Sequence, residues 1–244
     1  MNVVWFSCGV TSAVMAKIAL REYSDCRVIF IRTGSEHPDS FRFLSDIKKW
    51  LGVSIEVYES PTFQNHWDVI AKTRYLNGAA GARCTLELKK KVRYKIEDSI
   101  GYWEHQLFGF DASELTRSKR FAEQNPSCRA VYPLIDYGLT KEDCMAILGD
   151  AGIAIPEMYK LGFHNNNCIG CVKGGKSYWS LVRKCFPDAY HHMVQLESSI
   201  GHSCIKDFFL KDLPLDYPID SPICPSCNLW CDLDFFHLPM WDTY

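Results

Sequence analysis

The sequence of 244 residues has no hydrophobic run long enough to span a membrane, and residues 1–6 lack the basic and apolar regions of a signal peptide. It has little net charge, −2 at pH 7, which excludes a general attraction to nucleic acid or to an anionic membrane surface. Internal repeats and low-complexity segments are absent as well. We therefore expect a cytoplasmic protein with no membrane partner. Its 12 cysteines are then reduced thiols, metal ligands or catalytic groups rather than a disulfide framework.

Short apolar runs alternate with helical patterns along the first 150 residues. Strands are predicted at residues 3–6, 27–31, 53–58 and 106–110, and helices at residues 13–20, 40–51 and 63–73, with a further helix opened by Cys84. This alternation predicts an α/β fold, with a mostly parallel twisted sheet that carries helices on both faces. In such a fold, ligands bind at the carboxyl ends of the strands.

A turn of small residues joins the first predicted strand to the first helix. The N-terminal N–H groups of a helix have no helical partners, and the helix dipole favours negative charge there. Gly9 lets the backbone approach an anion, and the hydroxyls of Ser7, Thr11 and Ser12 can add donors. The turn therefore predicts a phosphate or sulfate site. The competing interpretation is an ordinary turn, which uses the same residue types.

Six segments carry motifs in a fixed order along the chain: residues 7–14, 30–43, 83–85, 109–120, 132–137 and 162–171. Together they resemble the motifs of the sulfonucleotide reductases, the phosphoadenylyl-sulfate and adenylyl-sulfate reductases of the adenine-nucleotide α-hydrolase superfamily. The first resembles the family's pyrophosphate loop and the second its loop around the adenine nucleotide. The resemblance implies an adenine nucleotide or sulfonucleotide as ligand. Its candidate binding residues are Ser7, Cys8, Gly9, Thr11, Ser12, Thr33, Gly34, Glu36, Lys89, Gly109, Arg117 and Arg120.

The chain departs from the family pattern at two positions that bear on the reaction. ATP-cleaving members of the superfamily carry an aspartate in the first loop, where this chain has Thr11. An aspartate suits the handling of magnesium and pyrophosphate, so its absence favours binding of a sulfonucleotide over cleavage of ATP. Asp111 stands where the family often has arginine, which weakens the expectation of one phosphate or sulfate contact.

Cys84 and the Cys-x-x-Cys pair Cys168 and Cys171 are candidate metal ligands. A Cys-x-x-Cys pair has good chelate geometry for soft metals. The resemblance implies that the three thiols meet beside the nucleotide and hold a 4Fe–4S cluster, whose fourth ligand comes from elsewhere or is absent. The competing interpretation is a set of unrelated buried thiols.

The resemblance covers about residues 3–185 and thereby divides the chain. We expect residues 1–210 to form a nucleotide-binding α/β domain with a helical C-terminal part. Residues 211–244 are rich in proline and cysteine, which is typical of an extended tail, and we expect this tail to pack over the domain.

Cysteines of this tail have three possible roles. The resemblance implies that Cys227 is the nucleophile that attacks the sulfur of the substrate and forms an S-sulfo intermediate. Cys231 or a thioredoxin-like thiol donor would then resolve that intermediate. Cys227 can equally supply the fourth ligand of the cluster. The third role is a zinc site formed by Cys224, Cys227, Cys231 and His237.

Residues 170–177, Gly-Cys-Val-Lys-Gly-Gly-Lys-Ser, satisfy the spacing of a phosphate-binding P-loop. A true P-loop follows a buried strand, whereas the polar residues 164–167 precede this segment. We therefore predict that it is not a P-loop, and that Lys173 and Lys176 supply positive charge near the substrate or cluster.

Together these patterns predict an enzyme that reduces adenylyl sulfate or its 3'-phosphorylated form and releases sulfite. One alternative is an ATP-dependent thiolation enzyme, which adenylates a nucleic acid or other acceptor and delivers sulfur through the cluster. A second alternative is a protein that binds nucleotide and cluster without turnover. A zinc-binding tail would instead indicate a docking module for a partner.

Overall fold

The computed structural model describes residues 1–78 and 81–219. Five strands form one sheet in the order β3-β2-β1-β4-β5. Their bounds are Asn2–Trp5 (β1), Cys26–Arg32 (β2), Ile55–Glu59 (β3), His105–Leu107 (β4) and Ala130–Val131 (β5). Neighbouring strands pair in parallel throughout this order. The α/β fold with a parallel sheet is therefore confirmed.

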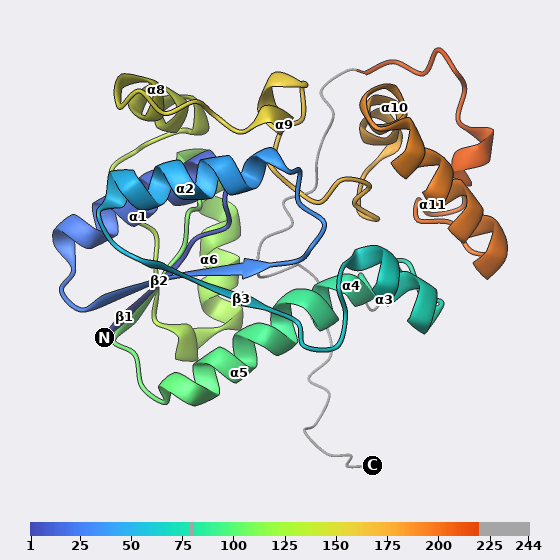
Figure 1. Cartoon of the computed structure of the whole chain (residues 1–244). Helices are drawn as coiled ribbons and strands as arrows, with labels where there is room; N and C mark the ends of the chain where they lie inside the picture. Colours follow the sequence, from blue (N-terminus) through green and yellow to red (C-terminus); the bar gives the residue numbers. More distant parts are fainter. Residues whose placement is uncertain (79–80, 220–244) are drawn as a thin grey trace.

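Helices connect the strands and continue into a helical C-terminal part (Figure 1). The longer ones are α1 (Val10–Glu22), α2 (Asp39–Leu51), α3 (His66–Thr73), α5 (Lys91–Ile100), α6 (Leu115–Gln124), α8 (Lys141–Asp150), α10 (Lys176–Cys185) and α11 (Pro187–Ile200). Shorter pieces are α4 (Arg83–Thr85), the π-helical η1 (Leu86–Lys90), η2 (Ala112–Glu114), η3 (Pro126–Cys128), α7 (Pro133–Asp136), α9 (Glu157–Lys160) and η4 (Leu210–Asp212). Within the two described ranges, no helix has the length and apolar character needed to cross a bilayer.

Side chains of β1 alternate between the two faces of the sheet and contribute to two hydrophobic cores. Val4 belongs to the core that contains Phe43 of α2 and many residues of α1. Val3 and Trp5 belong to the core on the opposite face, together with Val92 of α5. Figure 1 accordingly shows α1 and α2 on one side of the sheet and α5 on the other. A parallel sheet buried in this way needs helices on both faces, as the sequence predicts.

A third core forms in the C-terminal part of the chain, where α10 and α11 pack together. It surrounds the fully buried Trp179 and Met193 and includes Ile70 of α3. Cys171 is also part of this core. The packing of α10 and α11 therefore positions the loop that carries the Cys-x-x-Cys pair.

The first part of the predicted tail lies against α10. Arg183 donates hydrogen bonds to the carbonyl oxygens of Leu213, Pro214 and Leu215 at 2.8, 2.5 and 3.1 Å, and Ser180 Oγ donates to the Tyr217 carbonyl at 2.9 Å. The rest of the tail, with Cys224, Cys227, Cys231 and His237, lies outside the described residues. Its predicted roles stay predictions.

Candidate functional site

The turn between β1 and α1 is organised around the hydroxyl of Ser12. This oxygen accepts hydrogen bonds from the backbone N–H groups of Ser7 and Gly9 at 3.1 and 3.3 Å, and it donates to the Gly9 carbonyl at 2.9 Å. Because Ser12 is only 2% exposed, its hydroxyl shapes the turn. The N-terminal end of α1 thereby lies at the carboxyl edge of the sheet, where the helix dipole favours an anion.

Cys8 adopts a left-handed backbone conformation in this turn, with φ of 62°, a region that favours glycine. Its carbonyl accepts a hydrogen bond from Asn166 Nδ2 at 2.8 Å, and its Sγ donates to the Ser40 carbonyl at 3.4 Å. Burial raises the pKa of the Cys8 thiol, and the negative charges of Glu36 and Asp39 act in the same direction. Burial thus favours the protonated thiol, and the contacts of Cys8 with Asn166 and Ser40 hold the turn in place.

Gly109 follows β4 and lies directly against the start of α1. A Cβ atom at this position would lie 2.8 and 2.9 Å from the Cα and backbone N of Ser12. Real side chains do not tolerate such contacts with backbone atoms. The neighbouring strand therefore reaches the first turn only because residue 109 is a glycine.

Arg117 and Arg120, which are predicted nucleotide-binding residues, lie on α6. The Arg117 guanidinium pairs with the Glu114 carboxylate and lies 4.7 Å from the ring centre of Phe110. Arg120 is exposed. These two contacts of Arg117 are with residues close in sequence, and the role of both arginines toward an anion stays a prediction.

The second loop follows β2 and is held by the carboxylate of Glu36. This carboxylate accepts hydrogen bonds from the Thr33 backbone N–H and hydroxyl at 2.7 and 2.6 Å, and from the Ser35 N–H at 3.1 Å. Gly34 has φ of 71°, and a Cβ there would lie 1.9 Å from the Gln64 carbonyl oxygen. Glu36 and Gly34, which the sequence marks as nucleotide-binding residues, thus fix the shape of the loop.

Ser35 connects this second loop to α3 and to the Cys-x-x-Cys loop. Its hydroxyl accepts from the His66 backbone N–H at 3.0 Å and lies 2.6 Å from His66 Nδ1. Its carbonyl accepts from the Ile169 N–H at 3.0 Å. Two residues before Ser35, Thr33 Oγ1 lies 3.2 Å from Cys168 Sγ. The loop predicted to bind the nucleotide therefore touches a predicted metal ligand directly.

The Cys-x-x-Cys loop is closed by the hydroxyl of Tyr178, a buried side chain of α10. This hydroxyl accepts from the Cys171 N–H at 2.9 Å and donates to the Cys168 carbonyl at 3.0 Å. Gly170, between the two cysteines, has φ of 77°, and a Cβ there would lie 2.7 Å from the ring of Trp67. Tyr178 of α10 thus closes the loop, and Gly170 lets the loop pack on Trp67 of α3.

The segment with P-loop spacing, residues 170–177, has no preceding strand. Turns and irregular backbone occupy residues 161–175, and α10 begins at Lys176. Cys171 lies inside the segment and faces the pocket described next. The prediction that this segment is not a P-loop is confirmed.

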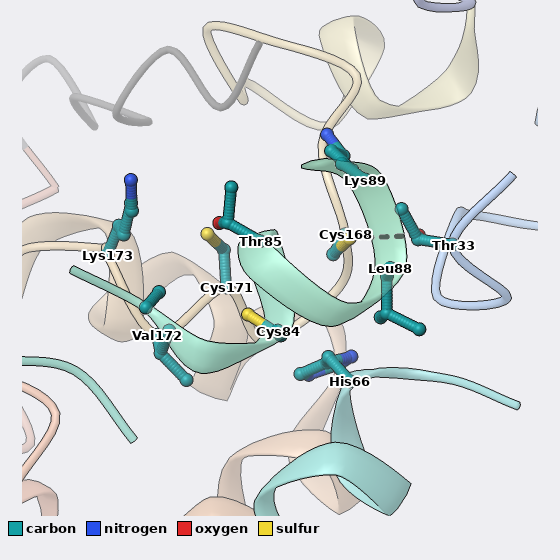
Figure 2. A pocket seen from close by; sticks show the side chains of 11 residues that line it. Thr33, His66, Cys84, Thr85, Leu88, Lys89, Cys168, Cys171, Val172 and Lys173 are labelled. Carbon is teal, nitrogen blue, oxygen red and sulfur yellow. Dashed lines mark hydrogen bonds between the residues drawn. The ribbon is translucent and has the colours of Figure 1, made fainter. Parts of the chain in front are cut away.

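Cys84, Cys168 and Cys171 line one pocket, although they come from distant parts of the chain (Figure 2). Cys84 belongs to α4, whereas the pair belongs to the loop before α10. The complete lining is Thr33, His66, Ala82, Cys84, Thr85, Leu88, Lys89, Cys168, Cys171, Val172 and Lys173. The structure therefore brings together the three predicted ligands, one residue of the second loop and two lysines.

The thiols of this pocket have suitable chemistry for a metal centre, but they are not arranged around one point. Within residues 1–78 and 81–219, no three His, Cys, Asp or Glu side chains form a ready-made metal site. The cavity is about 20 Å³, room for about one water molecule, and Figure 2 shows the Cys168 sulfur paired with Thr33. The donor set fits, since Lys89 and Lys173 can balance thiolate charge. The pocket would have to widen for these cysteines to hold a cluster.

Sequence reasoning missed the residues that join these parts. Ser35 lies inside a predicted motif, but its spacing gives no sign of its contacts with His66 and Ile169. Asn166 stands in the polar stretch before the Cys-x-x-Cys pair, and its amide binds the Cys8 carbonyl of the first turn. A tertiary hydrogen bond of this kind has no local sequence signal.

Comparisons with known proteins agree with this arrangement. Residues 1–98 match the family model of the phosphoadenosine phosphosulfate reductase domain; this range includes both loops and Cys84. The fold is similar to that of a phosphoadenylyl-sulfate reductase from Candida auris, solved as a phosphate complex. The TM-score is 0.52 at 13% sequence identity, over 68% of this chain and 80% of the other.

Two curated relatives extend the similarity beyond the matched domain. An uncharacterised protein of Methanocaldococcus jannaschii is 24% identical over 206 residues, which cover 81% of this chain and 47% of the relative. An uncharacterised nin region protein of Escherichia phage lambda is 28% identical over 71% of this chain and 66% of the relative. The chain thus spans about half of the archaeal relative and just under two thirds of the phage relative.

Proposed function

Because residues 1–98 carry a phosphoadenosine phosphosulfate reductase domain, we propose that this chain binds an adenine nucleotide with a phosphate or sulfate group at the N-terminus of α1. The turn before α1 and the loop after β2 follow neighbouring strands and lie at the same edge of the sheet. In open α/β sheets this edge is where ligands bind. Gly109 lets the end of β4 approach the same turn.

The observation that carries the proposal is the contact between the second loop and the cysteine pocket. Thr33 Oγ1 lies 3.2 Å from Cys168 Sγ, and the Ser35 carbonyl binds the Ile169 N–H. A nucleotide held by these loops would therefore lie next to a group of thiols. That juxtaposition suits transfer or reduction of sulfur better than nucleotide binding alone.

For the reaction, we propose reduction of a sulfonucleotide with a cysteine as nucleophile. A thiolate attacks the sulfate sulfur, the bond from sulfur to the bridging phosphate oxygen breaks, and the nucleoside phosphate leaves. A dithiol donor of the thioredoxin class then releases sulfite from the S-sulfo cysteine and is itself oxidised to a disulfide. Cys227 remains our candidate nucleophile. It lies outside the described residues, and its assignment comes from the family resemblance.

We further propose that Cys84, Cys168 and Cys171 are the protein ligands of a metal centre in the pocket, an iron–sulfur cluster in the first instance. Such a centre would place iron–sulfur chemistry next to the nucleotide's sulfate or phosphate group, and Lys89 and Lys173 would balance the charge of its thiolates. Lys89 lines the same pocket and can contribute to anion binding there.

Sulfite release is the direct test of the proposed reaction. Anaerobically purified protein is incubated with adenylyl sulfate or its 3'-phosphorylated form and a dithiol, and sulfite is measured. We expect release from one of the two substrates, abolished by Cys227→Ser and retained by Cys185→Ser, a half-buried cysteine of α10 outside the pocket.

Absence of sulfite from both substrates would refute the reductase. Cleavage of ATP to AMP and pyrophosphate in the presence of a thiolation acceptor would instead identify a sulfur-transfer enzyme. Both assays use the same protein preparation, so the two reactions are distinguished directly.

Metal analysis tests the cysteine assignment separately. We expect about four iron and four acid-labile sulfide per chain, lost in Cys84→Ala and kept in Cys185→Ala. Zinc without iron, at a level that the Cys84→Ala substitution does not change, would contradict a cluster in this pocket. It would place the metal at other residues.

A further inference from the structure

Tyr159 lies at the N-terminal end of α1, although it belongs to α9, far along the chain. Its hydroxyl accepts a hydrogen bond from the backbone N–H of Val10 at 3.4 Å. A Cβ on Gly9 would lie 3.2 Å from the same hydroxyl oxygen. Val10 is the first residue of α1, so this hydroxyl is beside the turn where the helix dipole favours an anion.

A charged pair on α2 holds α9 in this position. Arg42 binds both carboxylate oxygens of Asp39, at 2.7 and 2.8 Å, and also donates to the carbonyls of Ala154 and Ile155 at 2.9 and 3.2 Å. The Asp39 carboxylate in turn accepts from the Glu157 N–H, at the start of α9, at 2.9 Å. The beginning of α2 therefore docks α9, and the placement of Tyr159 is built into the fold.

The chemistry of this hydroxyl suits recognition of an anion. A tyrosine hydroxyl accepts one hydrogen bond while donating another. Acceptance from the Val10 N–H polarises the O–H bond and makes its proton a better donor. A phosphate or sulfate oxygen at the turn would receive that proton in a charge-assisted hydrogen bond, which is stronger than a neutral one.

We propose that Tyr159 is a substrate-binding residue whose hydroxyl donates a hydrogen bond to the phosphate or sulfate group of the nucleotide at α1. This inference rests on the proposed nucleotide site and adds to it a group from the C-terminal half of the chain. Phenylalanine at this position keeps the ring that packs on the core with α1 and removes only the donor.

Calorimetric titration of Tyr159→Phe tests the proposal, with adenylyl sulfate and adenosine as probes. We expect Tyr159→Phe to raise the Kd for adenylyl sulfate about 10-fold, as for the loss of one hydrogen bond to a charged group. The Kd for adenosine, which lacks the phosphate and sulfate, stays the same. Tyr137→Phe is the matched control, because the Tyr137 hydroxyl contacts Arg21 at the other end of α1.

Each outcome decides the proposal. Unchanged or tighter binding of adenylyl sulfate by Tyr159→Phe overturns it, and so does an equal loss of affinity for adenosine, which would indicate a distorted loop. If the unaltered protein binds adenylyl sulfate, either of these two outcomes refutes the role of Tyr159 and leaves the proposed nucleotide site standing. If the unaltered protein binds neither probe, the nucleotide site itself is refuted, and Tyr159 with it.

A second variant tests the same contact without altering the tyrosine. In Gly9→Ala, the added Cβ presses on the Tyr159 hydroxyl at 3.2 Å, and we expect weaker binding of adenylyl sulfate. In the Tyr159→Phe background, Gly9→Ala should raise the Kd for adenylyl sulfate less, because the hydroxyl oxygen that the Cβ crowds is gone. Independent, additive effects of the two changes would contradict the proposed contact.

Discussion

At the scale of single residues, the site depends on positions that accept no side chain. Gly109 touches the Ser12 backbone, and Gly34 touches the Gln64 carbonyl. Both contacts join strand ends or loops that are distant in sequence. The sequence identifies both glycines through family motifs, but the reason for them, close approach of two backbones, is visible only in the structure.

Gly109→Ala should destabilise the protein and disturb the turn before α1. A Cβ placed 2.8 Å from the Ser12 Cα must displace backbone, a strain of about 1–3 kcal/mol. Gly149→Ala is the control with the opposite sign, since Gly149 lies in α8 and no side chain or distant backbone atom of residues 1–78 and 81–219 lies within 4 Å of the added Cβ. We expect it to stabilise the helix by about 0.5–1 kcal/mol. Urea unfolding measures both, and equal effects would contradict the packing described.

Asp39 should make stability depend on acid pH. Its hydrogen bonds with Arg42 lower the pKa of its carboxyl from 3.8 to about 2. Because the pKa of this carboxyl is lower in the folded than in the unfolded state, its ionised form stabilises the fold at pH values above the unfolded-state pKa. This stabilisation is lost as the pH falls from about 4 toward 2. Because the Asp39–Arg42 pair is partly exposed, we expect this loss to lower the free energy of unfolding by only about 1 kcal/mol.

The measurement compares free energies of unfolding of the unaltered protein and Asp39→Asn between pH 5 and pH 2, a range set by the unfolded and folded pKa values of the carboxyl. The variant should lose less stability over this range. Asp98→Asn, an exposed position on α5, should follow the unaltered protein. Parallel curves for all three proteins would contradict the role of the Asp39–Arg42 pair.

At the scale of elements, long and periodic segments are predictable and short ones are not. The strands β1 and β2 and the helices α1 and α2 appear where apolar runs and helical spacing place them. β5 has two residues and α9 has four, which is too short to show the hydrophobic periodicity of a strand or a helix. Yet α9 carries Tyr159, so an element invisible in the sequence contributes to the proposed nucleotide site.

The Cys-x-x-Cys loop should loosen when Tyr178 loses its hydroxyl. Tyr178→Phe leaves the buried Cys171 N–H without this acceptor, a cost of about 1–3 kcal/mol. We expect faster alkylation of Cys168 and Cys171 by iodoacetamide, measured by mass spectrometry. Tyr190→Phe is the control, because its buried hydroxyl binds the Leu210 carbonyl at 2.6 Å. If both variants showed faster alkylation of Cys168 and Cys171, in proportion to their loss of unfolding free energy, a specific role of Tyr178 would be contradicted.

At the scale of the whole molecule, three hydrophobic cores bring the loops and the cysteine pocket together. Two cores hold the sheet between its helices, and the third attaches α10 and α11 with the Cys-x-x-Cys loop. The sequence predicts the sheet and each motif separately, because each is a local pattern. It does not predict the hydrogen bonds of Ser35 and Asn166 that join the motifs, since these depend on packing between distant segments.

We propose that the nucleotide loops and the cysteine pocket form one site. The most direct test is the alkylation rate of Cys168, which lies 3.2 Å from Thr33, on anaerobic, chelator-treated protein with and without saturating adenylyl sulfate. We predict that bound nucleotide slows labelling of Cys168 several-fold and leaves Cys185 unchanged. Equal labelling of Cys168 in both conditions, with nucleotide binding demonstrated in the same sample, would contradict the claim.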